Sequence, residues 1–406
     1  MTGQKFDDAD YIEIMQAWEA CGRSISETGR RLNLTRNQVS WRLEQARTRG
    51  LLNSDRAPLE MPEPSPALDT AALKRALRGG RHSIDDLATS LEVSRGTVVD
   101  AIDAMRAASF AVHEQDGKHW LDTTPQAATD RQEAAHEYVS REDGSYIFGF
   151  TSDNHLGSKY SRLDVLRQLF ERFKAVGVDR VFNAGNWIDG EASFNKHDLV
   201  VHGMDAQCRY LAKHWPKIPG LTTYAVTGDD HEGWYSQREG VDMGRYAENK
   251  FKDAGRNDWV DLGYMEADIK LVHTGTGATN RLRVAHPGGG SAYAISYAPQ
   301  KYIESLDGGE KPGIVLLGHW HKMSFDNIRN VWVIQTGCTQ DQTPFGRKKK
   351  LDFQVGGGLC KLQQDPQTGA LTSCTVELMR FFNRAHYGTG RWSHHDEVTM
   401  AERVIS

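Results

Sequence analysis

The sequence predicts a mixed α/β fold for its larger, C-terminal part, preceded by two small and mainly helical domains. From residue 145 onward, short apolar runs alternate with amphipathic helical runs, the pattern of strands covered by helices. Before residue 125, two groups of short helical segments are separated by a proline-rich stretch. A length of 406 residues also favours several units over one domain.

The composition is that of a globular protein in water. Charged residues make up 25% of the chain and the net charge is −5, so a membrane-embedded or strongly basic protein is not expected. No apolar run approaches ~20 residues, and the N-terminus lacks a charged-then-apolar leader, so we expect no membrane partner and no secretion. Five scattered cysteines fit a reducing, cytoplasmic location and argue against cysteine as a metal ligand.

Residues 1–55 are expected to form a helix-turn-helix domain. Ser26 and Thr35 are the expected caps of a short second helix and a longer third helix, which is the arrangement of a DNA reader. The third helix begins with residue types that contact base edges and phosphates: Arg36, Asn37, Gln38, Ser40 and Arg42. The alternative is a three-helix bundle that binds protein and has a solvated basic face.

Three further segments lie around a second small domain. Residues 56–68 contain four prolines and are expected to be a linker. Residues 69–124 predict a winged-helix-like domain of three helices and a hairpin. Because this domain has more acidic than basic residues, the alternatives are a spacer, a dimerisation module and a weak DNA contact. We expect residues 125–144 to be a polar helical connector and residues 381–406 to be a C-terminal tail.

The remaining domain, residues 145–380, repeats one pattern five times: an apolar run followed by residues that bind metals. Helices are expected between these runs over 162–176, 197–215 and 240–254. The five runs supply these candidate ligands: Asp153, His155, Asn186, Asp189, Asp229, Asp230, His231, His286, His319 and His321. Imidazole together with carboxylate suits Zn, Mn, Fe or Ni better than Ca.

The order and spacing of D-x-H, G-N-x-x-D, G-D-D-H-E, H and G-H-x-H resemble the calcineurin-like metallophosphoesterase superfamily, which includes the Mre11-type nucleases. The resemblance implies a four-layer fold, a β-sandwich flanked by helices, with two divalent metal ions at the strand ends. Manganese is the expected metal, with Zn, Fe or Ni as alternatives. The resemblance assigns the first metal to Asp153, His155 and His321, the second to Asp230, His286 and His319, the bridge to position 186, and assistance of the leaving group to His231, next to Asp230.

Two positions depart from the family pattern. The family has Asp where this chain has Asn186, and Asn where this chain has Asp230. A neutral amide bridges two cations poorly because it brings no charge to offset their repulsion. We expect a paired exchange that keeps both metals, with Asp230 taking over the bridge. The alternatives are one weak metal site, or a replacement by Asp229 or Asp189.

An arginine-rich helix-turn-helix joined to such a domain makes DNA the expected partner and a nuclease of phage type the expected activity. Trp234, Tyr235 and the basic run 347–350 are candidate substrate contacts. Two alternatives stay open: a phosphatase or phosphodiesterase for a small phosphoester, and a catalytically weak DNA-binding regulator that retains a metal site. The oligomeric state is open too, a homo-oligomer included.

Overall fold

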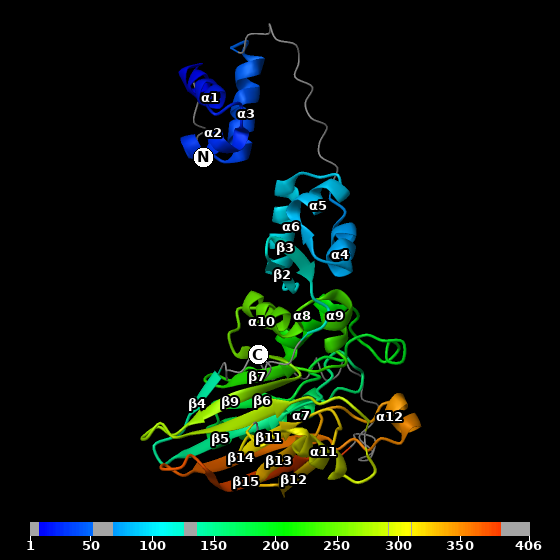
Figure 1. Ribbon diagram of the computed structural model, residues 1–406. Coiled ribbons are helices and arrows are strands. Elements are labelled where there is room, and N and C mark those ends of the chain that lie inside the picture. Colours follow the sequence, from blue (N-terminus) through cyan, green and yellow to red (C-terminus); the bar gives the residue numbers. More distant parts are fainter. Residues whose placement is uncertain (1–7, 52–67, 126–135, 291, 310, 383–406) are drawn as a thin grey trace. The chain divides into compact units, whose positions relative to one another are not determined.

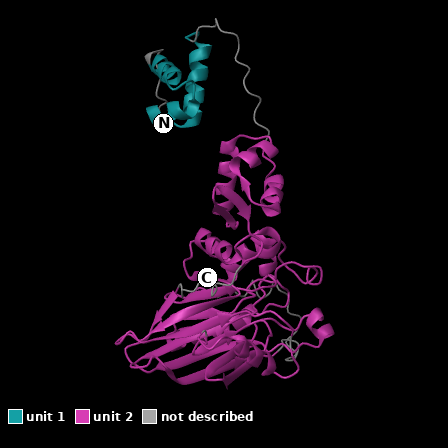
Figure 2. Cartoon of the chain, viewed as in Figure 1, with its two compact units in different colours: residues 1–67 teal, residues 68–406 magenta. Residues whose placement is uncertain are grey.

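The computed structural model describes residues 8–51, 68–125, 136–290, 292–309 and 311–382 (Figure 1). The chain divides into two compact units, residues 1–67 and residues 68–406 (Figure 2). Apart from Leu68, the expected linker lies outside the described residues, as does the expected tail beyond Phe382. None of the described helices is both long enough and apolar enough to cross a membrane.

The first unit consists of three helices that pack on one another: α1 (Asp8–Ala20), α2 (Ile25–Leu32) and α3 (Arg36–Thr48). Thr35 caps α3 as predicted, in a reciprocal capping box with Gln38. The predicted cap of α2 is wrong by two residues, because Ser24 rather than Ser26 accepts the N–H of Glu27. The backbone N–H of Ser24 bonds to Cys21, which turns the chain into the helix two residues earlier than expected.

The second unit begins with a small module of three helices and a three-stranded sheet in the order β1-β3-β2. Ser83 and Asp86 form the predicted capping box, and Ser94 caps the last helix of the module. Asp116 and Gly117, both with positive φ, make the two-residue turn of the hairpin. The elements are α4 (Thr70–Gly79), β1 (His82–Ser83), α5 (Ile84–Ser90), α6 (Arg95–Ala107), β2 (Val112–Gln115) and β3 (Lys118–Leu121).

This module is held against the larger part of the second unit through the segment 109–111. Ala111 donates its N–H to the carbonyl of Gly240 at 2.7 Å, and Asp242 donates its N–H to the carbonyl of Ser109 at 2.8 Å. The Phe110 side chain, which lies between these bonds, packs against the apolar cores of both parts. Backbone pairing and a shared apolar side chain therefore join the module to the segment that follows helix α9 (Gly233–Glu239).

The larger part contains two six-stranded sheets, ordered β12-β13-β11-β10-β9-β4 and β15-β14-β5-β6-β7-β8 (Figure 1). The first sheet is built from β4 (His136–Val139), β9 (Glu266–Val272), β10 (Thr279–Ala285), β11 (Ile314–Leu317), β12 (Met323–Ile328) and β13 (Val331–Thr336). The second is built from β5 (Ser145–Thr151), β6 (Arg180–Asn183), β7 (Thr222–Thr227), β8 (Trp259–Tyr264), β14 (Gly356–Gln364) and β15 (Leu371–Arg380).

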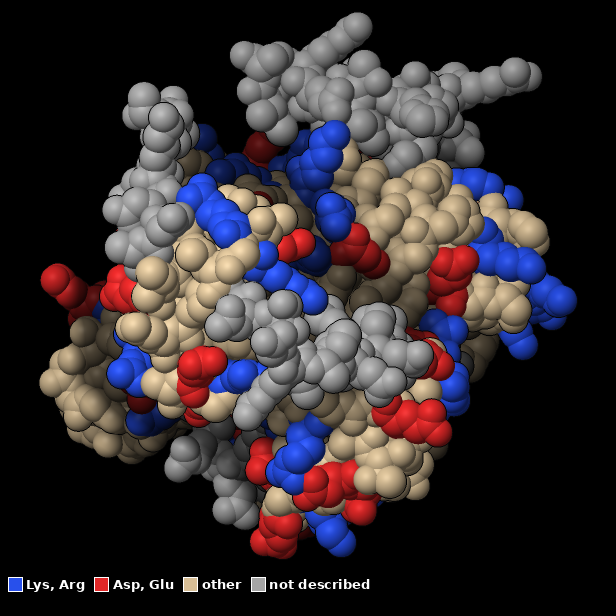
Figure 3. Space-filling view, turned by 90° about the horizontal axis from the view of Figure 1, so that it is seen from above, with Lys and Arg blue, Asp and Glu red and all other residues tan. Residues whose placement is uncertain are grey.

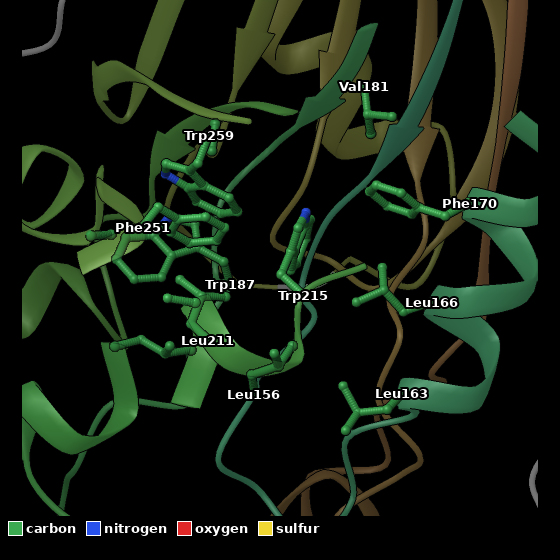
Figure 4. Close-up of a cluster of buried hydrophobic side chains, with 14 of the residues drawn as sticks. Leu156, Leu163, Leu166, Phe170, Val181, Trp187, Leu211, Trp215, Phe251 and Trp259 are labelled. Carbon is green, nitrogen blue, oxygen red and sulfur yellow. The ribbon is translucent and has the colours of Figure 1, made fainter. Parts of the chain in front are cut away.

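The two sheets pack face to face with helices on both outer sides, which makes four layers. Phe148, Phe150 and Leu282 belong to the apolar core between the sheets. The second sheet is covered by α7 (Leu163–Val176), α8 (Met204–His214) and α10 (Met243–Asp253) over a core that includes three tryptophans (Figure 4): Trp187, Trp215 and Trp259. Helix α11 (Tyr297–Ser305) covers the first sheet. The mixed α/β fold is confirmed.

Three predicted elements of this part need correction. The expected helix over 197–215 begins only at Met204, because the backbone of residues 198–200 bonds to Gly157 and Lys159 in the loop after β5. The expected helix over 240–254 begins at Met243, and the unpredicted α9 ends at Glu239 with Gly240 as its C-cap. The expected helical connector contains strand β4, which pairs with β9 in parallel; residues 126–135 lie outside the described part.

Candidate metal centre

The candidate ligands lie at the C-terminal ends of parallel strands. Strands β5, β6 and β7 run parallel in one sheet, and β10 and β11 run parallel in the other. The loop that follows each strand therefore emerges at the same edge, and the five sequence blocks meet there. The structure places Asp153, His155 and His321 in one group of possible metal ligands, and Asp229, Asp230, His286 and His319 in another. His155 also belongs to a third group, with Asp189 and His231.

The first group converges on one carboxylate oxygen. The Oδ1 atom of Asp153 lies 3.3 Å from Nε2 of His321 and 4.0 Å from Nε2 of His155. The other oxygen of Asp153 accepts the Ser152 hydroxyl at 2.6 Å and the His319 N–H at 2.9 Å, which fixes the direction of Oδ1. These contacts orient three ligand atoms toward a common point.

The second group contains two histidines, each with one ring nitrogen that faces away from the group and is hydrogen-bonded to a backbone carbonyl. His286 Nδ1 donates to the carbonyl of Ala184 at 2.6 Å, and His319 Nε2 donates to the carbonyl of Gly289 at 2.7 Å. Their inner nitrogens face each other at 3.2 Å, and His286 Nε2 lies 3.3 Å from Oδ1 of Asp230. In the neutral tautomer both inner nitrogens present lone pairs, so this approach requires a proton or a cation between them.

Asn186 lies between the two groups. Its Nδ2 donates to Oδ1 of Asp153 at 3.3 Å, while its Oδ1 is buried and has no hydrogen-bond partner in the described part of the chain. A buried amide oxygen left unpaired costs about 1–3 kcal/mol, and coordination of a cation would remove that cost. Gly228 closes over the same oxygen at a distance that leaves no space for a Cβ. The residues at this position therefore fit a metal.

The geometry bears on the exchange of Asn186 and Asp230. The carboxylate of Asp230 lies 3.3 Å from His286 and 3.7 Å from His319, both in the second group, and 3.9 Å from His231. Asp229 adds a second carboxylate to that group. Asp189 instead binds Nδ1 of His155 at 3.0 Å, which orients the ring of that histidine. Both residues that the sequence offered as replacements lie in groups of possible ligands: Asp229 with Asp230, His286 and His319, and Asp189 with His155 and His231.

His231 lies beside the second group with its ring held from two sides. Its Nδ1 donates to the carbonyl of Asp189 at 2.7 Å, and its Nε2 lies 3.9 Å from Oδ2 of Asp230. The ring stacks on Trp234 with 4.8 Å between ring centres and meets the ring of His155 edge-on at 4.3 Å. The imidazole is thus fixed with Nε2 toward the two groups, where the sequence resemblance places a proton donor.

The backbone at the site is unusual in a way that the sequence does not signal. Six of the candidate residues have left-handed backbone angles, with φ between 47° and 76°: Asp153, His155, Asn186, His231, His319 and His321. Residues other than glycine seldom adopt this region, and such conformations concentrate at functional sites. The turns aim each side chain back toward the strand ends, so the fold accepts local strain at the site.

Charge at the site is unevenly distributed. Burial opposes ionisation of Asp153, yet His321, His286 and His155 lower its pKa well below the usual value. Burial and the neighbouring His231 lower the pKa of His155 to about 4. Burial opposes protonation of His286, but Asp230 and Asp153 raise its pKa to about 9. A carboxylate with a lowered pKa and an imidazole with a raised pKa therefore lie in one site, and a metal ion bound there would compete with protons for these groups.

Glu232 is a residue of the site to which the sequence gave no role. The side chain is fully buried, and its Oε1 accepts the backbone N–H groups of Asn186 and Gly228, both at 2.8 Å. Burial raises its pKa to about 7. Glu232 thus ties the loop after β6 to the loop after β7 and sets the position of Asn186. Its place in the G-D-D-H-E block was the available signal.

A cavity of about 480 Å³ opens over the candidate ligands. His155, Asp230 and His319 lie on its wall, and Trp234 lines it as predicted. The prediction for Tyr235 is wrong, because this side chain is buried in the core under α9. Aromatic side chains that the sequence did not single out complete the lining: Phe194, Phe345 and Phe353. The basic run 347–350 ends helix α12 (Pro344–Lys349) beside the cavity, and Lys349 is part of the lining.

The predicted DNA-binding residues lie on helix α3 of the first unit. Arg36, Asn37, Gln38 and Ser40 are exposed, and Arg42 is half-buried. The Gln38 side-chain oxygen is engaged in the capping box, so this residue has a structural role in addition. Val39 points into the core of the unit. A polar face at the start of α3 is therefore available, and contact with DNA stays a prediction.

No protein-family model matches the sequence, and no curated protein matches it. Among solved structures, an archaeal phosphodiesterase is similar with a TM-score of 0.31 and 14% identity, over 58% of this chain and 100% of that chain. Vps29 from Entamoeba histolytica complexed with zinc has a TM-score of 0.31 and 13% identity over 58% and 100%. The phosphoesterase YfcE from E. coli has a TM-score of 0.28 and 10% identity over 57% and 98%.

Proposed function

We propose that this chain is a metallophosphoesterase with two metal sites that hydrolyses phosphodiester bonds of DNA. The observation that carries the proposal is the convergence of two groups of aspartate and histidine atoms on either side of Asn186. Such ligand sets suit Mn, Zn, Fe or Ni. Two neighbouring divalent ions would supply Lewis-acid activation of the phosphoryl group and of a water molecule.

The first ion would be held by Asp153, His155 and His321, and the second by Asp230, His286 and His319. Asp229 supports the second set, because it brings negative charge that Asn186 does not. Coordination of a metal ion would give the buried, unpaired oxygen of Asn186 a partner. The carboxylate that compensates for the neutral Asn186 would therefore lie at the second metal site and not at the bridging position.

His231 is the proposed proton donor to the leaving oxygen. Because Nδ1 donates to the carbonyl of Asp189, the protonated ring offers its second proton at Nε2, toward the cavity. Oδ1 of Asp189 lies 3.7 Å from Nδ1, and Oδ2 of Asp230 lies 3.9 Å from Nε2. A positioned acid of this kind contributes about 10²- to 10⁴-fold to a rate.

The DNA assignment is supported by the first unit. Its helices α2 and α3 are joined by a three-residue turn, and the start of α3 presents arginine, asparagine and serine to solvent. Binding of DNA by this unit would raise the local concentration of phosphodiester bonds near the metal centre. A cavity of about 480 Å³ also suits a small phosphodiester, which is the second candidate substrate.

The test uses the full chain, stripped with EDTA and reloaded with Mn, on a chromogenic phosphodiester and on labelled single- and double-stranded DNA. We expect metal-dependent hydrolysis that falls at least a hundredfold in His231→Ala and is unchanged in His214→Ala, a histidine at the end of α8. Metal content, measured by mass spectrometry, should be equal in both variants. Hydrolysis of the small ester alone would favour the second candidate, and no hydrolysis of any substrate would overturn the enzyme proposal.

A further inference from the structure

One wall of the cavity is built from aromatic side chains that come from three separate segments. Phe194 belongs to the loop after β6, Trp234 to α9 and Phe345 to α12. The rings of Phe194 and Phe345 lie 4.6 Å apart at 32°, and Phe194 meets Trp234 edge-on at 5.8 Å. Trp234 in turn stacks on His231. A continuous aromatic surface thus runs from the proposed proton donor to the rim.

This surface is open to solvent at its outer end. Phe194 is 43% exposed and Phe345 is 37% exposed, although large aromatic side chains are usually well buried. Isolated exposed apolar residues are ordinary, but these two contact each other and line the cavity over the metal centre. Their position indicates a flat apolar group as the ligand.

Positive charge lies next to the aromatic wall. Helix α12, which carries Phe345, exposes Arg347, Lys348 and Lys349 in its last turn. The Nζ atom of Lys349 lies 5.9 Å from the ring centre of Phe345 and lines the cavity. Figure 3 shows one face of the molecule, on which basic and acidic side chains are mixed. A flat apolar wall beside a basic edge is complementary to a nucleobase attached to a phosphate.

We propose that Phe194, Trp234 and Phe345 form a stacking site for one unpaired nucleobase of the substrate, with Lys349 facing an adjacent phosphate. The inference deepens the proposed function and rests on it for the identity of the reaction. A base within a duplex has both faces covered by its neighbours, so it cannot stack on this wall. The site therefore selects single-stranded or frayed nucleic acid, and it tolerates any base because every base has a π-face.

The test compares two phosphomonoesters that differ by the presence of a base: thymidine 5′-monophosphate and deoxyribose 5-phosphate. Binding to the full chain is measured in EDTA by ligand-observed NMR, so no turnover occurs. Stacking on aromatic side chains contributes about 1–3 kcal/mol per base, so we expect the nucleotide to bind about 5- to 150-fold more tightly. Phe345→Ala should abolish this ratio, and Phe345→Trp should restore it.

Tyr297→Ala provides the matched control, because Tyr297 is an exposed aromatic residue on α11 that does not line the cavity. This variant should keep the wild-type ratio. Equal binding of the two probes by the wild type, or a ratio that survives in Phe345→Ala, would overturn the stacking site. Base-dependent binding without metal-dependent cleavage would support the stacking site and reject the proposed hydrolysis, so the two failures are distinguishable.

Discussion

The amide nitrogen of Asn186 donates to Oδ1 of Asp153 at 3.3 Å, and this bond leaves the Asn186 oxygen buried and unpaired within the described residues. The same Asp153 oxygen lies 3.3 Å from Nε2 of His321. One side chain thus stands between the two ligand groups and has a free oxygen but no charge. The first experiment should therefore measure how Asn186 affects metal affinity and the stability of the fold.

Asn186→Asp should lower the stability of the metal-free protein and raise its affinity for metal. The new carboxylate would lie beside the carboxylate of Asp153 and repel it, and a buried charge that lacks an ion partner of its own costs about 3–5 kcal/mol. Metal binding would remove this repulsion, so Mn should raise the melting temperature more in the variant than in the wild type. Thermal unfolding with EDTA and with Mn measures both effects. Asn249→Asp on α10 is the control, and equal Mn-induced shifts in all three proteins would contradict the prediction.

Asp229→Asn should reduce the metal content, because Asp229 supplies the second carboxylate of the group with His286 and His319. We expect the bound metal to fall toward one equivalent per chain, as counted after dialysis. Asp189→Asn is the comparison, since Asp189 does not belong to the group that contains Asp229. It bonds to Nδ1 of His155, so its replacement should mainly reduce affinity. A full complement of metal in Asp229→Asn would show that Asp230 alone suffices.

Glu232→Ala should destabilise the chain by about 2–5 kcal/mol, because it leaves the backbone N–H groups of Asn186 and Gly228 buried without an acceptor. Glu232→Gln keeps an oxygen at this position and should stay close to the wild type. Urea unfolding of the metal-free proteins gives the difference. If the alanine and glutamine variants unfold together, the two bonds do not hold the loops.

Gly240→Ala should weaken the attachment of the small module to the larger part of the second unit. Gly240 has a φ of 66°, and a Cβ there would collide with Leu121 and Asp122 of the module. Gly255 has a similar φ of 68° but open space around it, so Gly255→Ala reports the backbone cost of about 1 kcal/mol alone. Thermal unfolding should show a clearly larger loss for Gly240→Ala. Equal losses of stability in the two variants would mean that the module moves to accommodate the new Cβ without a loss of binding energy.

Arg36→Ala should weaken DNA binding by the full chain and reduce its dependence on salt. A lysine or arginine that neutralises one phosphate contributes about one unit to the slope of log affinity against log salt. Fluorescence anisotropy with duplex DNA at several salt concentrations measures this slope. Lys270→Ala, which removes an exposed cation of β9 that pairs with Glu137, should leave it unchanged. An unchanged slope in Arg36→Ala would favour the protein-binding alternative for the first unit.

The sequence by itself determined the features that depend on neighbours a few residues away. The capping boxes of Thr35 with Gln38 and of Ser83 with Asp86 were predictable because both partners lie within one helical turn. The candidate ligands were predictable for a related reason. Each follows an apolar run, and the ends of parallel strands meet at one edge of a sheet.

The tertiary structure alone decided what depends on distant partners. Strand β4 exists because β9 offers a sheet edge, and α8 starts late because its expected first turns pair with the loop after β5. Asp229 joins the ligands, Glu232 fixes Asn186, and Phe194 meets Phe345 only through folding. These contacts join segments far apart along the chain, so no local periodicity records them. These contacts contribute to stability only in the folded chain, where the distant segments lie side by side.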